Sequence, residues 1–352
     1  MATTNFTSSD NLTLKLWGKA AFKDAVKQTI FGKLMGKTDT SIIQVKDELN
    51  KSAGDRVRFR LRSLPSGSPV TGNSTLEGNE EGLTYTSTDL FIDNMRHAMK
   101  VDLGISQQRV DFDLRNDAKA ACAEWWAERM DSSVINYLAG NTDASSTYQF
   151  AGNTITAPST NRIIYANDAT AKANVDAADK LSLSDIDRAV EKAKLASPTM
   201  RPANFGGETA FVMLLHPYQV HDLRTSTNTG QWLDIQKAAM QGGKISDNPI
   251  FSQALGKYHG VLLVESTRVP TFSDYGSGGN VAAARAMLLG SQSGIVSFGR
   301  GFGQERMKYT EKTFDYEDKV GIATSLIWGV QKTIFNSEDF GVICIDSAAA
   351  SH

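Results

Sequence analysis

A glycine- and lysine-containing stretch near the N-terminus is the first place where this sequence could do chemistry. Gly32-Lys33-Leu34-Met35-Gly36-Lys37-Thr38 contains the residue types of a phosphate-binding loop. Such a loop needs four residues between its glycines, with a strand before it and a helix after it, so that backbone N–H groups surround the phosphates. Here three residues separate the glycines, and the preceding residues have a helical pattern. Nucleotide binding at this stretch is therefore disfavoured.

No other stretch has the spacing of a catalytic or metal-binding motif. Gly299-Arg300-Gly301-Phe302-Gly303 begins like a dinucleotide-binding turn, but Gln304 stands where the third glycine belongs, which favours a flexible joint. His216 and His221 would lie ~140° apart on a helix, a poor arrangement for one metal ion. The other histidines are isolated, and no serine or cysteine lies in a nucleophile motif. We predict no catalytic, cofactor or metal site, and no enzymatic activity.

Charged residues instead gather between residues 51 and 104. Arginines alternate with Val57, Phe59 and Leu61, and a period of two places the guanidinium groups on one face of a strand. Glutamates follow in a glycine-rich segment. Opposite charges at separate points favour head-to-tail contacts between copies, which generate rings or lattices. The candidate inter-subunit residues are Arg56, Arg58, Arg60, Arg62, Glu77, Glu80 and Glu81.

These charges belong to a predicted long hairpin. Its return strand is predicted over residues 83–93, which are rich in threonine, aromatic and β-branched residues. A two-stranded ribbon alone is only marginally stable in water, so the hairpin must lie against another surface. That surface can belong to a second copy or to the hairpin's own chain.

Mixed helices and strands are predicted around the hairpin. Residues 12–35 form an amphipathic helical arm whose lysines, every four residues, we interpret as a solvated face rather than a DNA-binding stripe. Residues 106–138 follow a helical period up to a stop at Gly140, which predicts a helix ~50 Å long. Further helices are predicted after Ser182 or Ser184, after Pro217 and over 231–240, and strands over 209–215, 258–265, 286–289, 306–315, 320–335 and 342–345. Because no strict βαβ rhythm occurs, the class is α+β.

Composition excludes several classes of protein. The 352 residues carry a net charge of −2, which argues against a protein that coats nucleic acid. No secretory signal and no apolar run of ~18 residues is visible, so no membrane partner is expected. Cys122 and Cys344 are expected to be reduced, packed thiols, and nothing in the sequence supports a disulfide between them.

The order of arm, glycine-rich hairpin, long helix, mixed region and late strands resembles the major capsid proteins of tailed bacteriophages. The stretches GDRVRFRLRSLPSGSPVTGNSTLEGNEEGL, IDNMRHAMKVD and DLRNDAKAACAEWWAERMD are similar to the coat proteins of the N-four-like phage group. TAFVMLLHPYQVHDLR, YHGVLLVESTRVP and ARAMLLGSQSGIVSFGRG are similar to the strand and helix succession of the fold in general. The resemblance implies the Johnson (Hong Kong 97-type) capsid fold.

The resemblance also implies named parts and partners. The parts are an N-terminal arm (1–50), an extended loop over a neighbouring subunit (51–104), a peripheral domain (105–205) with its spine helix (106–138), an axial domain (206–299, interleaved), and late strands returning to the peripheral domain (300–352). Pentamers and hexamers would close an icosahedral virion shell around double-stranded DNA without sequence-specific binding. Assembly would take place in the bacterial host cytoplasm, with separate scaffold and portal proteins and, in some relatives, a cement protein.

The sequence departs from some relatives in two ways. Shells of some relatives are joined by lysine–asparagine bonds from the extended loop, but no lysine occurs between Lys51 and Lys100. The arm begins almost at once, so a built-in scaffold domain is not expected. Three alternatives stay open: an encapsulin-type compartment of the same fold, a DNA-binding protein that uses the lysine arm, and an enzyme whose site residues are scattered in the sequence.

Overall fold

The computed structural model describes residues 29, 31–46, 54–62, 67–83, 85–102, 104–111, 113–205, 208–226, 256–299, 307–316 and 318–351. Besides the helices and strands named below, short 3-10 turns occupy Phe31–Lys33, Ser146–Tyr148, Thr160–Arg162 and Lys172–Asn174.

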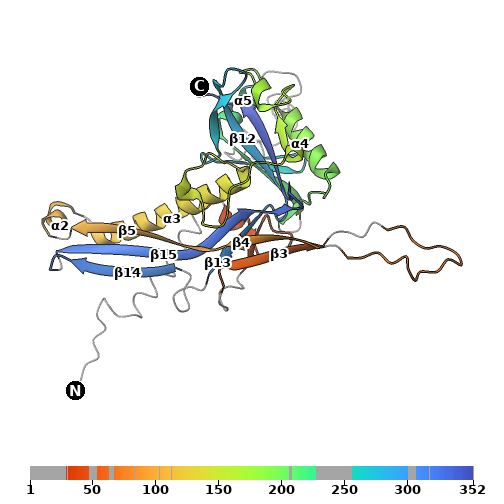
Figure 1. The fold of residues 1–352 in the computed structure, drawn as a ribbon. Coiled ribbons are helices and arrows are strands. Elements are labelled where there is room, and N and C mark those ends of the chain that lie inside the picture. Colours follow the sequence, from red (N-terminus) through yellow and green to blue (C-terminus); the bar gives the residue numbers. More distant parts are fainter. Residues whose placement is uncertain are drawn as a thin grey trace, which may run out of the picture.

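Strand β15 (Lys319–Lys332) is the centre of a six-stranded sheet, drawn in the lower half of Figure 1. Its first ten residues pair with β5 (Asp93–Asp102), and β14 (Met307–Phe314) pairs with an overlapping stretch, so these two strands lie on opposite edges of β15. Its last five residues pair with β13 (Gly294–Phe298). Strands β2 (Ile43–Lys46) and β1 (Met35–Gly36) continue the sheet beyond β13.

One long helix covers this sheet. Helix α3 (Leu114–Ala139) packs Ala118 and Cys122 against Val320 and Ile322, and the Trp126 indole N–H donates to the Thr324 hydroxyl at 2.7 Å. The prediction of one continuous helix over 106–138 is wrong at its start. The chain forms a short helix, α2 (Ile105–Arg109), becomes extended at Val110 and re-enters the helix after Asp113.

A side-chain cap explains the start of α3, and a glycine conformation explains its end. The Asp113 carboxylate accepts the backbone N–H groups of Arg115 (2.9 Å) and Asn116 (3.4 Å), which starts a new helix there. The predicted stop at Gly140 is confirmed, because this residue adopts the left-handed conformation (φ 61°) and its N–H bonds back to the last turn.

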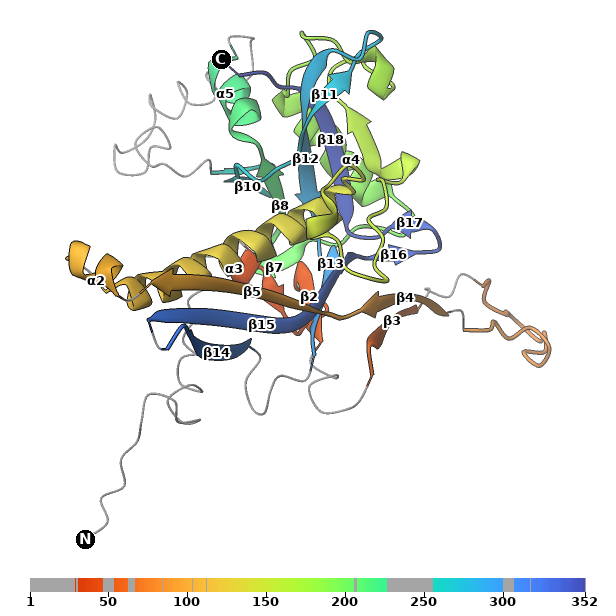
Figure 2. The same ribbon diagram turned by 60° about the vertical axis from the view of Figure 1, so that its left-hand side comes forward.

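A second, eight-stranded sheet lies above the first in both views (Figure 2). Its order is β6 (Ile163–Tyr165), β18 (Val342–Ala348), β12 (Val281–Leu289), β8 (Glu208–Leu215), β10 (Val261–Glu265) and β9 (Lys257–Tyr258). Strand β11 (Thr271–Tyr275) pairs with β12, and β7 (Ala203–Phe205) pairs with β8. Helices α4 (Leu183–Leu195) and α5 (Pro217–Thr225) pack apolar residues against this sheet.

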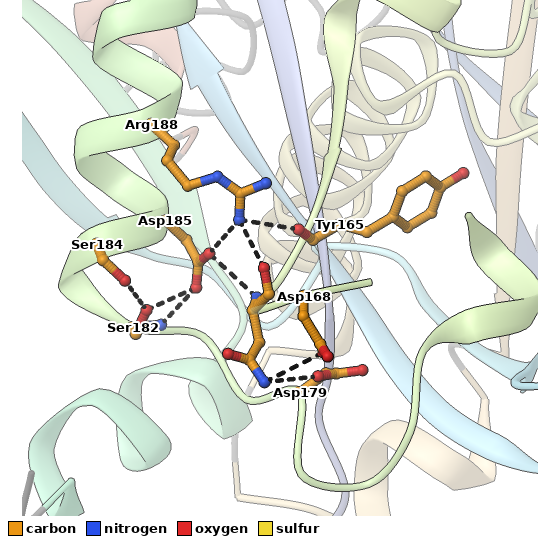
Figure 3. Close-up of polar contacts among 8 residues, drawn as sticks. Tyr165, Asp168, Asp179, Ser182, Ser184, Asp185 and Arg188 are labelled. Carbon is orange, nitrogen blue, oxygen red and sulfur yellow. Dashed lines mark hydrogen bonds and ion pairs between the residues drawn. The ribbon is translucent and has the colours of Figure 1, made fainter. Parts of the chain in front are cut away.

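The start of α4 confirms the predicted cap and chooses between its two candidates. Ser182 is the cap: the Asp185 carboxylate accepts its backbone N–H (3.1 Å) and its hydroxyl (2.7 Å), as Figure 3 shows. One nitrogen of Arg188 then donates to Asp185 and to the backbone carbonyls of Tyr165 and Asn167. These contacts join α4 to the end of β6.

Other expectations differ from the structure in detail. The strand predicted over 258–265 is the hairpin β9–β10, because His259 and Gly260 adopt positive φ and turn the chain. Strand β13 was not predicted. The helix predicted over 231–240 and most of the arm helix predicted over 12–35 lie outside the described residues, and the described end of that arm is a 3-10 turn followed by β1.

Strand pairing divides the chain differently from the consecutive ranges that the resemblance implies. Elements β6 and α4 belong to the eight-stranded sheet although they come directly after the long helix. Strand β18, near the end of the chain, also lies inside that sheet, between β6 and β12. Strand β13, by contrast, joins the six-stranded sheet. Such exchanges arise because strands far apart in the sequence pair with each other.

The isolated start of α3 makes its cap testable. Replacing Asp113 with alanine leaves the first backbone N–H groups of the helix without their acceptor, so we expect the free energy of unfolding of the unassembled subunit to fall by about 1 kcal/mol. Urea denaturation measures this change. Asp111→Ala removes an exposed carboxylate just outside the helix and should have little effect; an equal loss in both variants would contradict the assigned cap.

Candidate inter-subunit surfaces

The stem of the predicted hairpin exists and packs on its own subunit. Strands β3 (Arg56–Arg62) and β4 (Tyr85–Phe91) pair antiparallel over their whole length, with Phe59 opposite Thr88. The Phe59 side chain is only 3% exposed and clusters with Val57, Leu90 and Ile295 of β13. Of the two surfaces left open by the sequence, the same chain therefore covers the apolar side of the stem.

Polar contacts also fix the stem to the body. The Asn153 amide donates to the Phe91 carbonyl at 2.6 Å and accepts the Phe91 N–H at 2.9 Å. The Thr88 hydroxyl donates to the carbonyl of Ile334, in the small ribbon formed by β16 (Ile334–Phe335) and β17 (Glu338–Asp339). Since β4 leads directly into β5 of the main sheet, the stem has a fixed direction relative to the body.

Two of the four predicted arginines form ion pairs within the stem. Asp89 lies opposite Arg58 across the ribbon, and the two side chains form a bidentate ion pair with N–O distances of 2.6 and 2.9 Å. Arg56 reaches the same carboxylate at 3.4 Å. The hydrogen bond from Arg58 lowers the pKa of Asp89, although partial burial acts in the opposite direction. The sequence reasoning missed Asp89, because it becomes a partner of Arg58 only through the register of the ribbon.

The remaining arginines differ from that pair. Arg60 is exposed opposite Ser87, and among the described residues it has no ion pair. Arg62 pairs its backbone with Tyr85 at the outer end of the stem. Arg60 is thus better placed than Arg56 and Arg58 to meet another molecule.

The tip of the hairpin, residues 67–83, is where the chain lacks its own support. Every residue of the tip is exposed except the half-buried Val70. Leu76 and Leu83 are 64% and 58% exposed, unusual values for leucine. Figure 1 shows the tip projecting away from both sheets. The missing surface predicted for the hairpin therefore belongs to the tip and not to the stem.

The three predicted glutamates all lie on this tip and are exposed. Glu80 accepts the backbone N–H of Gly78, and Glu81 accepts that of Gly67, each at 2.7 Å. Gly78 has a φ of 90°, a conformation that other residues rarely adopt. Glu77 has no such bond to the tip backbone among the described contacts.

Two pairs of buried opposite charges lie in the body. Arg285 and Asp346 face each other on β12 and β18 and form a bidentate pair at 2.7 and 2.8 Å, and the Tyr275 hydroxyl donates to the same carboxylate. Burial and the nearby Asp346 charge raise the pKa of Tyr275. Lys332 and Asp339, each 2% exposed at the side chain, pair at 2.8 Å. These groups are invisible as pairs in the sequence, since each pair joins elements that meet only in the fold.

The cysteines and histidines that the sequence offered as candidate reactive residues have packing or capping roles in the fold. Cys122 and Cys344 are free and buried, and burial raises the pKa of Cys344 to about 12, so it remains a thiol at neutral pH. His216 caps α5, His97 stacks on Trp125, and within the described part of the chain no three His, Cys, Asp or Glu residues could hold a metal ion. Over those same residues, no helix has the length and apolarity needed to span a membrane.

The two glycine-rich stretches also lack the structure their motifs need. At Gly299, a Cβ atom would lie 2.5 Å from the Ile327 side chain, so this end of the predicted joint is tightly packed; Gly301 and Gly303 lie outside the described residues. Residues 31–36 form a 3-10 turn followed by β1, which is not the strand–loop–helix of a phosphate site.

Comparison with known proteins identifies the group to which this arrangement belongs. The family described as "Phage capsid protein" matches residues 5–351. The chain belongs to the phage capsid protein family. The major capsid protein of Pseudomonas phage KPP25 is 27% identical over 382 residues, which cover 98% of each protein.

Solved structures agree with this membership. The capsid of Ralstonia phage GP4 matches with a TM-score of 0.80 and 31% identity over 99% of this chain and 96% of that one. The Cyanophage Pam1 capsid matches with a TM-score of 0.75 and 22% identity over 93% and 94% of the two chains, which shows a shared fold. The expected fold is confirmed: this phage capsid protein has the Johnson fold, and its role is structural, in the head of the virion.

The different surroundings of stem and tip can be tested in the unassembled capsid protein. Phe59→Ala removes the ring that fills the space between the stem and β13, so the amide hydrogens of β3 and β4 should exchange with solvent faster. Hydrogen-exchange mass spectrometry measures this. Leu76→Ala changes an exposed side chain on the tip and should leave exchange in the stem unaltered. Unchanged exchange in the Phe59 variant would mean that the stem does not depend on the body.

Proposed function

We propose that many copies of this capsid protein assemble, as pentamers and hexamers, into an icosahedral head that encloses double-stranded DNA. The observation that carries the proposal is the tip, residues 67–83, which projects from a rigidly held stem with exposed leucines and glutamates. Leu76 and Leu83 contribute no buried apolar area while they remain in water, whereas a second copy can cover these side chains. Membership of the phage capsid family supports a shell as the product of that contact.

The proposal assigns each part of the subunit to an arm, a loop or a domain of a capsid protein. Residues 1–50 are the N-terminal arm, and the extended loop is the projecting part of 51–104, whereas β5 at its end is a strand of the body. The six-stranded sheet with the spine helix α3 is the peripheral domain, and the eight-stranded sheet is the axial domain that meets around the symmetry axes. The candidate inter-subunit residues remain the stem arginines and Glu77, Glu80 and Glu81, with Arg60 favoured over Arg56 and Arg58 because those two bind Asp89.

Further partners follow from the same proposal. A separate scaffold protein guides the curvature of the growing shell in the host cytoplasm, a portal occupies one vertex, and a cement protein reinforces the shell in some relatives. The net charge of −2 suits a container for DNA, because a strongly basic subunit would bind the phosphates and hinder packing and release.

Imaging of particles tests the proposal directly. We expect the chain, expressed with its scaffold protein, to form closed icosahedral shells in negative-stain electron microscopy, and shells from infected cells to contain DNA. Only monomers or small irregular aggregates under all assembly conditions would refute the proposed shell. Particles that contain an enzyme in place of DNA would favour a nanocompartment.

The extended loop should make no covalent bond between subunits, because residues 52–99 contain no lysine that could form an amide with an asparagine side chain. We expect mature particles, boiled in denaturant, to give a single monomer band on an electrophoresis gel. A ladder of covalent multimers would contradict this expectation.

Single charge reversals separate the roles of the stem arginines. Arg60→Glu should leave the unassembled subunit as stable as the wild type and reduce the yield of shells, since this exposed side chain has no ion pair within the described part of its own chain. Arg58→Glu places a second carboxylate beside Asp89 and should loosen the stem already in the monomer. Thermal unfolding of the monomers and particle counts by electron microscopy provide the two measurements. A normal shell yield from Arg60→Glu would show that Arg60 does not contribute to the contact between subunits.

A further inference from the structure

A pocket of about 640 Å³ opens beside helix α4 of the eight-stranded sheet (Figure 2). Part of its wall is the face of α4 that carries Arg188, Glu191, Lys192 and Leu195, which are spaced three or four residues apart. Another part is the 3-10 turn that ends at Arg162 and leads into β6. Three cationic side chains therefore line one pocket, although they come from two separate elements.

Arg162 is buried with an unsatisfied donor. The residue is 1% exposed, its Nη2 donates to the Pro198 carbonyl at 2.8 Å, and its Nη1 has no hydrogen-bond partner. A buried charged group without a partner is costly. Because a guanidinium carries donors and no acceptor, only an acceptor atom can satisfy Nη1, and a metal ion cannot.

Two carboxylates act on the charge of Arg162, but among the described contacts neither forms an ion pair with it. Glu338 accepts the side-chain amide of Asn161 at 2.9 Å. Asp339 is paired with Lys332 at 2.8 Å. Burial outweighs both carboxylates and lowers the pKa of Arg162. The fold thus leaves this cation without a matching charge of its own.

Backbone carbonyls hold the two cations of α4 in place. Lys192 Nζ donates to the Ile163 carbonyl at 3.0 Å. Arg188 uses Nη1 alone for its bonds to Asp185 and to two backbone carbonyls near the end of β6 (Figure 3). A carbonyl orients a cation without cancelling its charge. Within the described part of the chain Lys192 therefore has no ion pair, and Arg188 Nη2 takes part in none of these bonds.

The three cations lie close enough to repel one another. Burial is the main reason that the pKa of Lys192 is lowered, and the charges of Arg188 and Arg162 lower it further. Glu191, also in the pocket wall, is exposed. Like charges gathered around a pocket favour an anionic ligand, because an anion relieves their repulsion and accepts their free N–H groups.

The directions of the donors favour a phosphate group over a carboxylate. The two oxygens of a carboxylate lie in one plane and suit a single guanidinium, whereas phosphate oxygens point to the corners of a tetrahedron and can meet donors from a turn and a helix together. The pocket is also larger than one phosphate ion. Ile164 and Leu195, the latter 77% exposed, offer apolar contacts to the remainder of a phosphate ester.

We propose that this pocket binds a phosphate group, with Arg162 Nη1, Lys192 Nζ and Arg188 Nη2 as its donors. The ligand is free inorganic phosphate or the phosphate of a small organic ester. The inference goes beyond the proposed function and does not depend on assembly, because every residue of the pocket belongs to one chain.

Calorimetric titration of the unassembled capsid protein tests the site. Inorganic phosphate and adenosine monophosphate, each added at constant ionic strength, should bind saturably. Lys192→Met keeps the length of the side chain but removes its charge, so the affinity for phosphate should fall roughly tenfold. The matched control is Lys194→Met, because this exposed lysine lies on a different face of α4 and should not affect binding.

The same titrations distinguish the two sources of the phosphate group. Tighter binding of adenosine monophosphate would assign an organic ester as the ligand, and equal binding would assign free phosphate. Absence of saturable binding of both compounds would overturn the inference, as would an equal loss of affinity in the two lysine variants.

Hydrogen exchange on the wild-type protein makes the test independent of how the variants fold. Saturating phosphate should slow the exchange of amide hydrogens in residues 160–165 and in α4, because the ligand binds the folded state of this region. Exchange in α3, in the other sheet's layer, should stay unaltered. Protection confined to regions outside the pocket would place the bound phosphate elsewhere and overturn the inference.

Discussion

The packing of Phe59 and Val57 against Ile295 is the interaction on which the projecting part of the molecule depends. It fixes a two-stranded ribbon, which alone would be marginal in water, to strand β13 of the six-stranded sheet. Because the stem is held by apolar packing on β13 and by the Asn153 bonds to Phe91, the tip can leave the body in one direction without support of its own. A rigid stem lowers the entropy that a docking tip must lose.

Buried ion pairs, and the further hydrogen bonds of their cations, connect elements of the body. Arg285 of the eight-stranded sheet donates to the carbonyl of Ala139 at the end of α3 as well as to Asp346. Lys332, at the end of β15, pairs with Asp339 and donates to the Thr156 carbonyl. Such pairs add little net stability over apolar residues of equal volume, but the loss of one partner is costly, so they favour one arrangement of the body over others.

Division of the subunit into a self-sufficient body and a dependent tip suits the growth of a shell. The described core residues are covered within one chain, so the body can fold before assembly. Under the proposed function, the exposed tip contacts a neighbour after the body has folded. Contacts of modest strength let a wrongly placed subunit leave, and many such contacts together stabilise the closed particle. The family membership and the geometry of the chain therefore lead to the same description.

Local patterns in the sequence are enough to predict the separate elements: the alternation of Arg56–Arg62 predicts a strand, Ser182 and Gly140 mark helix ends, and the resemblance names the fold. Local rules suffice there, because backbone geometry and capping act over a few residues. Three contacts become known from the folded chain alone: the stem packs on its own β13, Asp89 pairs with Arg58, and Lys100 and Lys312 lie beside the ring of Phe314. Those facts depend on the pairing of strands that lie up to hundreds of residues apart, and the periodicity of a strand does not state its partner or its register.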